Sequence, residues 1–123
     1  MQFLTDPPHR PGLKPILARR IAQRIEARFS DPEFSIGSVV EELGYSRSQI
    51  IRVFKREFGK TPKEYLLSLR MSHAKQMIEE RPYQEVMPIA LEVGYENYEH
   101  FCREFRKKYG CPPSKWWPER QHR

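Results

Sequence analysis

Apolar residues along most of the chain recur at intervals of three and four, the spacing of one buried face of an α-helix. In residues 16–29 the periodic positions are Ile16, Leu17, Ile21, Ile25 and Phe29. Similar stretches predict further helices over residues 36–43, 46–58, 62–80, 86–93, 97–109 and a short one from Pro113 that carries Trp116 and Trp117. No segment alternates apolar and polar residues in the way typical of strands. The pattern therefore predicts an all-α fold of about seven helices.

Residues that start and stop helices lie at the ends of these stretches. Polar residues suited to cap a helix start are Ser35, Ser46 and Asn97. Gln49 follows Ser46 by three positions, which is the spacing of a capping box. Pro62 stands at a first helical position, and Pro82 ends that helix. Turns are expected at Gly44, Gly59, Gly94 and Gly110.

The N-terminal residues differ from the rest of the chain. Pro7, Pro8, Pro11 and Pro15 fall within residues 1–15, where they remove backbone donors and disfavour helix in the residues before them. We expect a flexible arm over residues 1–15. The remaining organisation is predicted as a first helical subdomain over 16–60, a linker helix over 61–81 and a second subdomain over 82–123.

The most informative feature is an internal repeat. The segment VVEELGYS at 39–46 matches IALEVGYE at 89–96, at an offset of 50, and after one inserted residue the match resumes at an offset of 51. The resumed pairs are Ile50 with Phe101, Phe54 with Phe105, Phe58 with Tyr109, Gly59 with Gly110, Pro62 with Pro113 and Tyr65 with Trp116. Each copy predicts a short helix, a turn that contains glycine, and a longer helix, the arrangement of a helix-turn-helix.

The longer helix of each copy has an apolar inner face and an outer face left free. The outer face of the first copy carries Arg47, Ser48, Ile51, Arg52 and Lys55, and that of the second carries Tyr98, Glu99, Cys102, Arg103 and Arg106. The second helix of a helix-turn-helix enters the major groove of DNA and reads base edges. The linker helix of 62–80, about 27 Å long, could separate two such helices by about the 34 Å between successive groove faces. A monomer could then read a site that is not palindromic.

The charged residues are distributed in segments that follow the two copies of the repeat. The net charge is +6, and residues 46–63 carry +5, residues 79–96 carry −4 and residues 98–123 carry +4. Two basic stretches favour two contacts on one polyanion, for which nucleic acid is the leading candidate. The alternatives are a helical protein-interaction module whose basic faces bind an acidic partner, and a binder of nucleic acid without sequence preference.

Several functional classes lack support in the sequence. No apolar run approaches the roughly 20 residues of a transmembrane helix, and the N-terminal segment MQFLTDPPHRPGLKP has no continuous apolar core of the signal-peptide type, so we expect a cytoplasmic protein. Cys102 and Cys111 are too few for a disulfide framework or a cysteine-only zinc site. No catalytic set, metal-ligand motif or phosphate-binding loop is evident, which predicts no enzyme activity, cofactor or metal.

The repeat resembles the DNA-binding domain of the AraC/XylS family of bacterial transcription regulators, over about residues 16–118. The first copy, GYSRSQIIRVFK from residue 44, is similar to the family's first motif, and YLLSLRMSHAKQMI at 65–78 is similar to its linker helix. The most specific likeness is IALEVGYENYEHFCREFRKKYGCPPSKW at 89–116. The resemblance implies two helix-turn-helix subdomains on one linker helix, bound in adjacent major grooves, and activation of transcription through RNA polymerase at the bacterial nucleoid.

By position, the resemblance places the family's base-reading residues at Ser48, Ile51, Arg52, Tyr98, Glu99, Cys102 and Arg103. We expect Arg52 and Arg103 to be the strongest readers, since arginine can bond O6 and N7 of guanine together. Phosphate contacts, which position a protein without specifying sequence, are expected from Arg47, Lys55, Arg56, Arg106 and Lys107.

Three features depart from the family pattern. Pro88 falls inside the first helix of the second copy, and Trp116 and Trp117 stand near a position more often filled by Tyr-Arg. Glu99 on the reading face would repel phosphate unless it accepts a hydrogen bond from N4 of cytosine. The second copy is thus expected either to read sequence weakly or to act partly as a scaffold. The chain is too short to include a separate ligand-binding domain, which leaves both a stand-alone regulator and a fragment of a longer one open.

Overall fold

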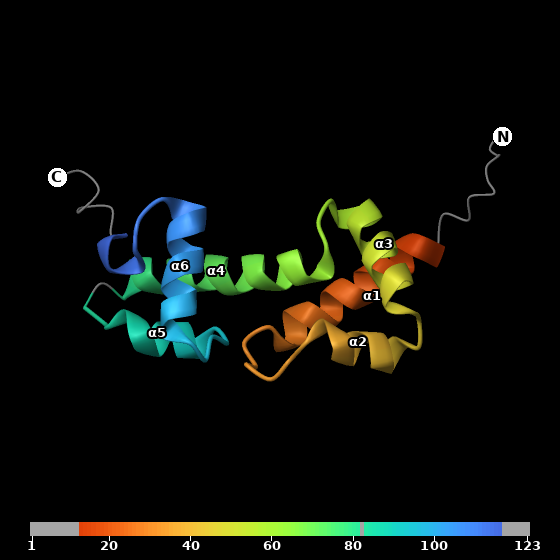
Figure 1. Ribbon diagram of the computed structural model, residues 1–123, viewed down its shortest axis with the longest axis horizontal. Coiled ribbons are helices and arrows are strands. Elements are labelled where there is room, and N and C mark those ends of the chain that lie inside the picture. Colours follow the sequence, from red (N-terminus) through yellow and green to blue (C-terminus); the bar gives the residue numbers. More distant parts are fainter. Residues whose placement is uncertain (1–12, 82, 117–123) are drawn as a thin grey trace. The chain divides into compact units, whose positions relative to one another are not determined.

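The computed structural model describes residues 13–81 and 83–116 of the 123-residue chain, and among these residues helices are joined by turns and loops with no strand (Figure 1). The six α-helices and one 3-10 helix are α1 (Leu13–Arg28), α2 (Ile36–Leu43), α3 (Arg47–Phe58), α4 (Pro62–Glu80), α5 (Val86–Glu92), α6 (Tyr98–Tyr109) and η1 (Pro113–Lys115). The predicted all-α fold is therefore confirmed. Residues 1–12 of the arm predicted over 1–15, the predicted stop at Pro82 and Trp117 lie outside the described residues.

The first helix differs from its prediction at both ends. It begins at Leu13 rather than at residue 16, because Pro15 falls in its first turn, where a missing amide costs no intrahelical hydrogen bond. It ends at Arg28, so Phe29 already belongs to the following segment. The prediction that Ile16 lies on the buried face is wrong, because its side chain is 59% exposed.

The other helix ends follow their capping residues. Ser46 and Gln49 form the predicted capping box at the start of α3, with the Gln49 amide 3.2 Å from the Ser46 hydroxyl oxygen and the Ser46 amide 3.1 Å from Oε1 of Gln49. Ser35 and Asn97 cap α2 and α6 as predicted. Thr61 and Glu64 exchange two such hydrogen bonds around the start of α4.

The described chain divides into two compact units. One unit comprises residues 13–28 and 35–66, and the other comprises residues 29–34, 67–81 and 83–116. The chain thus passes between the units within α4 and on either side of residues 29–34. These six residues, which we call segment 29–34, lead from α1 to α2 but pack with the second unit.

Each unit has its own core beneath its longer helix. In the first unit, Ile50 and Phe54 of α3 are fully buried, as are Ile21 and Ile25 of α1. In the second unit, Phe101 and Phe105 of α6 are fully buried within a cluster that also contains Met71, Ala74, Ile78, Val86, Ile89, Ala90, Val93 and Tyr95. The repeated positions Ile50, Phe54, Phe101 and Phe105 thus form the core, as predicted. The prediction is wrong for Phe58, which is 39% exposed because it is the last residue of α3.

The structure extends the repeat to a third pair of helices. At an offset of 53, three buried positions of α1 match buried positions of α4: Ala18 with Met71, Ile21 with Ala74, and Ile25 with Ile78. The α4 helix therefore supports the second unit as α1 supports the first. The sequence does not display this relation, because only Ile25 and Ile78 are identical and the other two pairs share burial alone.

An aromatic cluster closes the same end of each unit. In the first, the rings of Phe54, Phe58 and Tyr65 lie 4.6–5.7 Å apart, and the Tyr65 hydroxyl donates to the Glu26 carboxylate. In the second, the rings of Phe105, Tyr109 and Trp116 lie 4.7–6.0 Å apart. The indole Nε1 of Trp116 donates to Oε2 of Glu79 at 2.8 Å. Trp116 is thus a core seal, and Glu26 and Glu79 again differ by 53 positions.

Candidate nucleic-acid interface

The α3 helix presents most of the predicted contact residues of the first unit. Its inner face buries Ile50, Val53 and Phe54, while Gly44, in the left-handed conformation at φ 78°, turns the chain from α2 into it. The exposed side chains are Arg47, Ser48, Arg52, Lys55 and Arg56. Ile51 is half-buried, which leaves part of its apolar surface accessible beside Arg52.

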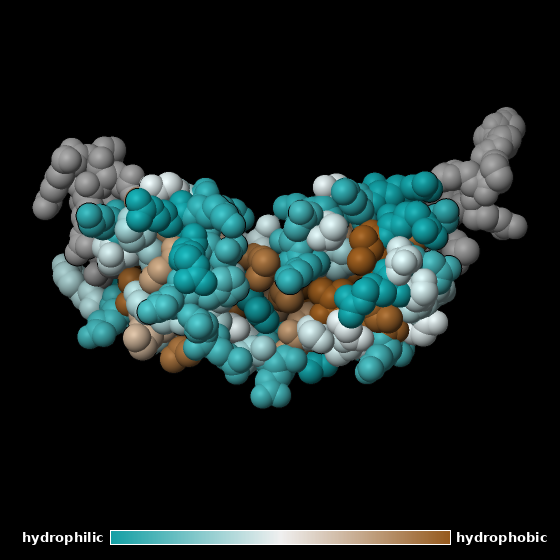
Figure 2. Space-filling model, in the orientation of Figure 1, coloured by the Kyte–Doolittle hydropathy of each residue, from teal (hydrophilic) through white to brown (hydrophobic). Residues whose placement is uncertain are grey.

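The α6 helix repeats this arrangement in the second unit. Phe101 and Phe105 face inward, and the surface over this helix is largely hydrophilic (Figure 2). The predicted contact residues that are exposed here are Glu99, Arg103, Arg106 and Lys107. At an offset of 51, Arg103 takes the position of Arg52 and Cys102 that of Ile51. The outer faces of α3 and α6 therefore share an arginine that follows an apolar residue.

Tyr98 and Cys102 take part in the core as well as the outer face. Both side chains are half-buried and pack against the apolar cluster of the second unit. The Tyr98 ring stacks on Phe101, with centroids 6.2 Å apart and an interplanar angle of 20°. Only part of each side chain is therefore available to a ligand, in contrast to the neighbouring Arg103.

The cations of α6 differ in the partners they have. The Lys107 ammonium lies 3.8 Å from a carboxylate oxygen of Glu104, which also lies 3.8 Å from Nε2 of His100. Such an exposed ion pair is weak and is easily exchanged for a phosphate.

Within the part of the chain that the structure describes, neither Arg52 of α3 nor Arg103 of α6 forms a hydrogen bond or ion pair through its side chain. Their guanidinium groups are thus available for a ligand.

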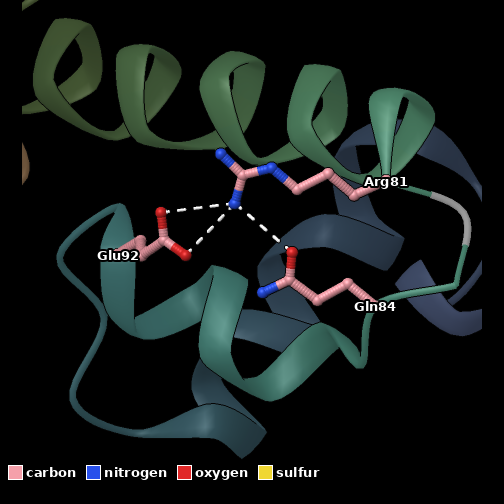
Figure 3. Close-up of polar contacts among 3 residues, drawn as sticks. All are labelled: Arg81, Gln84 and Glu92. Atoms are coloured by element: carbon pink, nitrogen blue, oxygen red, sulfur yellow. Dashed lines mark hydrogen bonds and ion pairs between the residues drawn. The ribbon is translucent and has the colours of Figure 1, made fainter.

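The end of α4 holds the first helix of the second unit. Nη1 of Arg81 lies 3.2 Å and 3.4 Å from the two carboxylate oxygens of Glu92 and 3.3 Å from Oε1 of Gln84 (Figure 3). This contact joins the residue after α4 to the last residue of α5. Because the side chains are nearly half exposed, its contribution to stability is small, about 0–1 kcal/mol. No sequence pattern marks this contact, because it depends on where α4 and α5 end.

The proline in α5 does not disturb it. The helix runs from Val86 to Glu92, so that Pro88 lies in the first turn, where a missing amide removes no intrahelical bond. Val86, Ile89 and Ala90 of the same helix are buried. The departure from the family pattern at Pro88 is therefore compatible with the helix that precedes the turn into α6.

The raised pKa values of three tyrosines predict that the protein loses stability at high pH. Burial is the largest cause that raises the pKa of Tyr65, Tyr95 and Tyr98, each to about 12 from 10. Their contribution to stability is complete below pH 10 and is lost as the pH rises toward 12, because the unfolded chain releases these protons first. Urea unfolding at pH 9, 10 and 11 should therefore show a falling free energy of unfolding. A free energy of unfolding that stays constant over this pH range would contradict the raised pKa values of these tyrosines.

Other kinds of site find no support in the described part of the chain. No group of three or more His, Cys, Asp or Glu side chains there could hold a metal ion. Among the same residues, no helix combines the length and apolar character needed to cross a membrane.

Comparisons with known proteins agree with this geometry. A family model described as a helix-turn-helix domain matches residues 39–118. The transcriptional activator RhrA of Rhizobium meliloti is 36% identical over 95 residues, which cover 76% of this chain and 30% of RhrA. An uncharacterised HTH-type transcriptional regulator of Haemophilus influenzae is 33% identical over 84 residues, covering 68% of this chain and 28% of that protein. The chain thus spans about a third of the length of the curated relatives it matches.

Solved structures show the same fold. The C-terminal domain of AraT, a response regulator from Geobacillus stearothermophilus, superposes with a TM-score of 0.77 at 29% identity, over 87% of this chain and 85% of that one. A probable AraC family regulator from Rhodopseudomonas palustris gives a TM-score of 0.71 at 26% identity, over 85% of this chain and 96% of that one. The chain therefore belongs to the AraC family of transcriptional regulators, as a helix-turn-helix DNA-binding domain.

Proposed function

We propose that the chain reads a specific duplex by placing α3 and α6 in two successive major grooves. The observation that carries this proposal is the shared outer face of the two helices, on which Arg52 and Arg103 occupy equivalent, exposed positions without a protein partner among the described residues. In each helix the opposite face is covered by the core, so only this face can meet a ligand.

The residues of these faces divide by chemistry. Base reading is assigned to Ser48, Ile51, Arg52, Tyr98, Glu99, Cys102 and Arg103, and phosphate binding to Arg47, Lys55, Arg56, Arg106 and Lys107. Arg52 and Arg103 would each bond a guanine, while the accessible parts of Ile51 and Cys102 offer apolar contact with a thymine methyl. Glu99, in the position of Ser48, would accept from N4 of a cytosine. The half-sites would thus share a guanine and differ at the position that Glu99 reads.

The proposal extends to how the protein acts. Two reading helices in one chain would allow a monomer to occupy a non-palindromic site, where a single helix-turn-helix ordinarily dimerises. Activation through RNA polymerase is the regulatory outcome we propose, supported by the similarity to a protein described as a transcriptional activator. Its place of action would then be the nucleoid in the bacterial cytoplasm.

Selection of preferred duplexes from a random pool tests this function. We expect the selected sites to extend over about two helical turns, roughly 20 base pairs, and to be bound by one copy of the chain. If the five phosphate-binding cations each displace a counterion, log Kobs should fall with log salt with a slope of about −4 to −5.

Three other outcomes would contradict the proposal in different ways. Equal affinity for random and selected duplexes would indicate binding without sequence preference. Absence of salt-dependent DNA binding would favour a protein-interaction module. Sedimentation of two copies with one duplex would contradict monomeric binding.

A further inference from the structure

One buried cation has no role in the interface described above. Arg70 on α4 is 8% exposed and is the only charged side chain that is buried among the described residues. It stands on the face of α4 that buries Met71, Ala74 and Ile78. The equivalent residue of α1, at the offset of 53, is the aliphatic Leu17. Burying a charge is costly unless it is well hydrogen-bonded, so its presence here in place of an aliphatic side chain calls for a physical reason.

The guanidinium group of Arg70 binds segment 29–34. Its Nε donates to the backbone carbonyl of Phe29 at 2.7 Å, and its Nη2 donates to the carbonyl of Asp31 at 3.1 Å. The Phe29 carbonyl directly follows the end of α1, where helix carbonyls lack intrahelical partners and favour a positive charge. The ring of Phe29 also packs on His73 of α4, with centroids 4.4 Å apart. The segment is thus held on α4 by polar and apolar contacts.

The same group also contacts the turn that precedes α6. The guanidinium carbon of Arg70 lies 5.8 Å from the centroid of the Tyr95 ring. A Cβ atom added to Gly94 would lie 2.8 Å from both Nε of Arg70 and the carbonyl oxygen of Phe29. Segment 29–34, Arg70 and the Gly94–Tyr95 turn therefore pack together without spare room. We call this arrangement the Arg70 joint, and all of it lies within the second unit.

The repeat shows that a helix-turn-helix does not need such a joint for its own stability. At the first turn, a Cβ atom on Gly44 would meet nothing within 4 Å. Tyr45 is 41% exposed, whereas the equivalent Tyr95 is 4% exposed. The first unit therefore forms with an open turn. The contacts of Arg70 with the second turn therefore go beyond what a single helix-turn-helix unit requires to fold.

We propose that Arg70 is a positioning residue for DNA binding: it fastens segment 29–34, which leads into the first helix-turn-helix, to the turn of the second. The inference rests on the proposed function, because it concerns how two reading helices act on one duplex. With the joint closed, the chain links the two units through both α4 and segment 29–34. With the joint open, α4 alone restrains them, and the effective concentration of one unit at its groove falls once the other is bound.

Duplexes with altered spacing test the proposal. The full chain and the variants R70M and R70K are titrated with the selected duplex and with the same duplex carrying one inserted base pair between the half-sites. We expect R70M to bind the selected duplex about tenfold more weakly, because the effective concentration of the second unit at its groove is lower. The ratio of its affinities for the selected and the lengthened duplex should fall toward one. R70K, which keeps the charge but cannot fork two carbonyls, should lie between R70M and the original chain.

The ratio of the two affinities separates positioning from general destabilisation. A variant that is only partly folded loses affinity for both duplexes by the same factor, so its ratio of affinities for the selected and the lengthened duplex stays that of the original chain. Such an unchanged ratio for R70M would overturn the proposal. Unchanged affinity of R70M for the selected duplex would overturn it as well. Exposed Arg20 on α1 supplies the matched control, and R20M should keep both affinities. If the original chain shows no preferred duplex, the proposed function itself fails, and this is seen before any variant is compared.

Hydrogen exchange supplies a measurement that needs no DNA and suits R70K if R70M folds poorly. The Phe34 amide donates to the carbonyl of Asp31 at 3.1 Å, and the Tyr95 amide donates to that of Ala90 at 3.0 Å. Loss of the joint should accelerate exchange of both amides together and leave the Gly44 amide of the first turn unchanged. Acceleration of only one, or equal acceleration at Gly44, would overturn the joint as a unit.

Discussion

Replacing Gly94 by alanine is expected to lower the free energy of unfolding by about 2–5 kcal/mol, combining the strain of a non-glycine residue at positive φ with overpacking. Gly94 has a φ of 106°, and the new Cβ atom would lie 2.8 Å from the carbonyl oxygen of Phe29. That oxygen belongs to the backbone and cannot turn aside as a flexible side chain could. Urea unfolding followed by far-UV circular dichroism measures the loss.

Gly44 supplies the matched control at the equivalent turn. Its φ of 78° also disfavours alanine, but the added atom would meet nothing within 4 Å. Gly44→Ala should therefore cost only the backbone term, about 1–2 kcal/mol. The difference between the two variants measures the close packing around Arg70. Equal losses at the two turns would show that this packing contributes nothing to stability.

Replacing Arg103 by alanine is expected to remove about 1–3 kcal/mol of discrimination at one base pair of the selected site, through the loss of a two-point contact with guanine. The side chain is exposed on α6 and its removal leaves the core unchanged. The measurement is a gel-shift titration against the selected duplex and against duplexes in which each position is changed in turn. The variant should become indifferent to one position and keep its preferences elsewhere.

Arg106, on the same helix, is the control for charge. As a phosphate contact, its replacement by alanine should weaken all duplexes alike and reduce the salt slope by about one. Arg52→Ala should repeat the Arg103 result at a position in the other half-site. If the Arg103 and Arg106 variants lose affinity equally on every duplex, the division into base and phosphate contacts is wrong.

Much of the local structure could be predicted because its causes lie close together in sequence. The capping box of Ser46 and Gln49 and the glycine that ends α3 at Gly59 act over a few residues, so the pattern alone locates α3. The start of α1 differs from the prediction because a proline disfavours helix only beyond the first turn, and Pro15 lies within that turn. Ile16 fits the apolar period but is exposed, because the period shows which face of a helix is apolar and not which of its residues another part of the chain covers.

The candidate interface was predictable in its residue types and less so in its exposure. Repeat pairing located the equivalent arginines, Arg52 and Arg103, and both are exposed. The half-buried state of Tyr98 and Cys102 depends on the neighbouring core, which a helical wheel does not contain.

The all-α class, the repeated helix-turn-helix and the arginines of its outer faces could be read from the residues alone, because helix period, caps and glycine turns are local properties. The folded chain was needed to show that α1 and α4 are equivalent supports, that segment 29–34 packs with the second unit, and that Arg70 joins this segment to the turn at Gly94. The carbonyls of Phe29 and Asp31 meet Arg70 and Gly94 across 39 to 65 positions of sequence. Every residue carries a backbone carbonyl, so no sequence pattern marks these contacts.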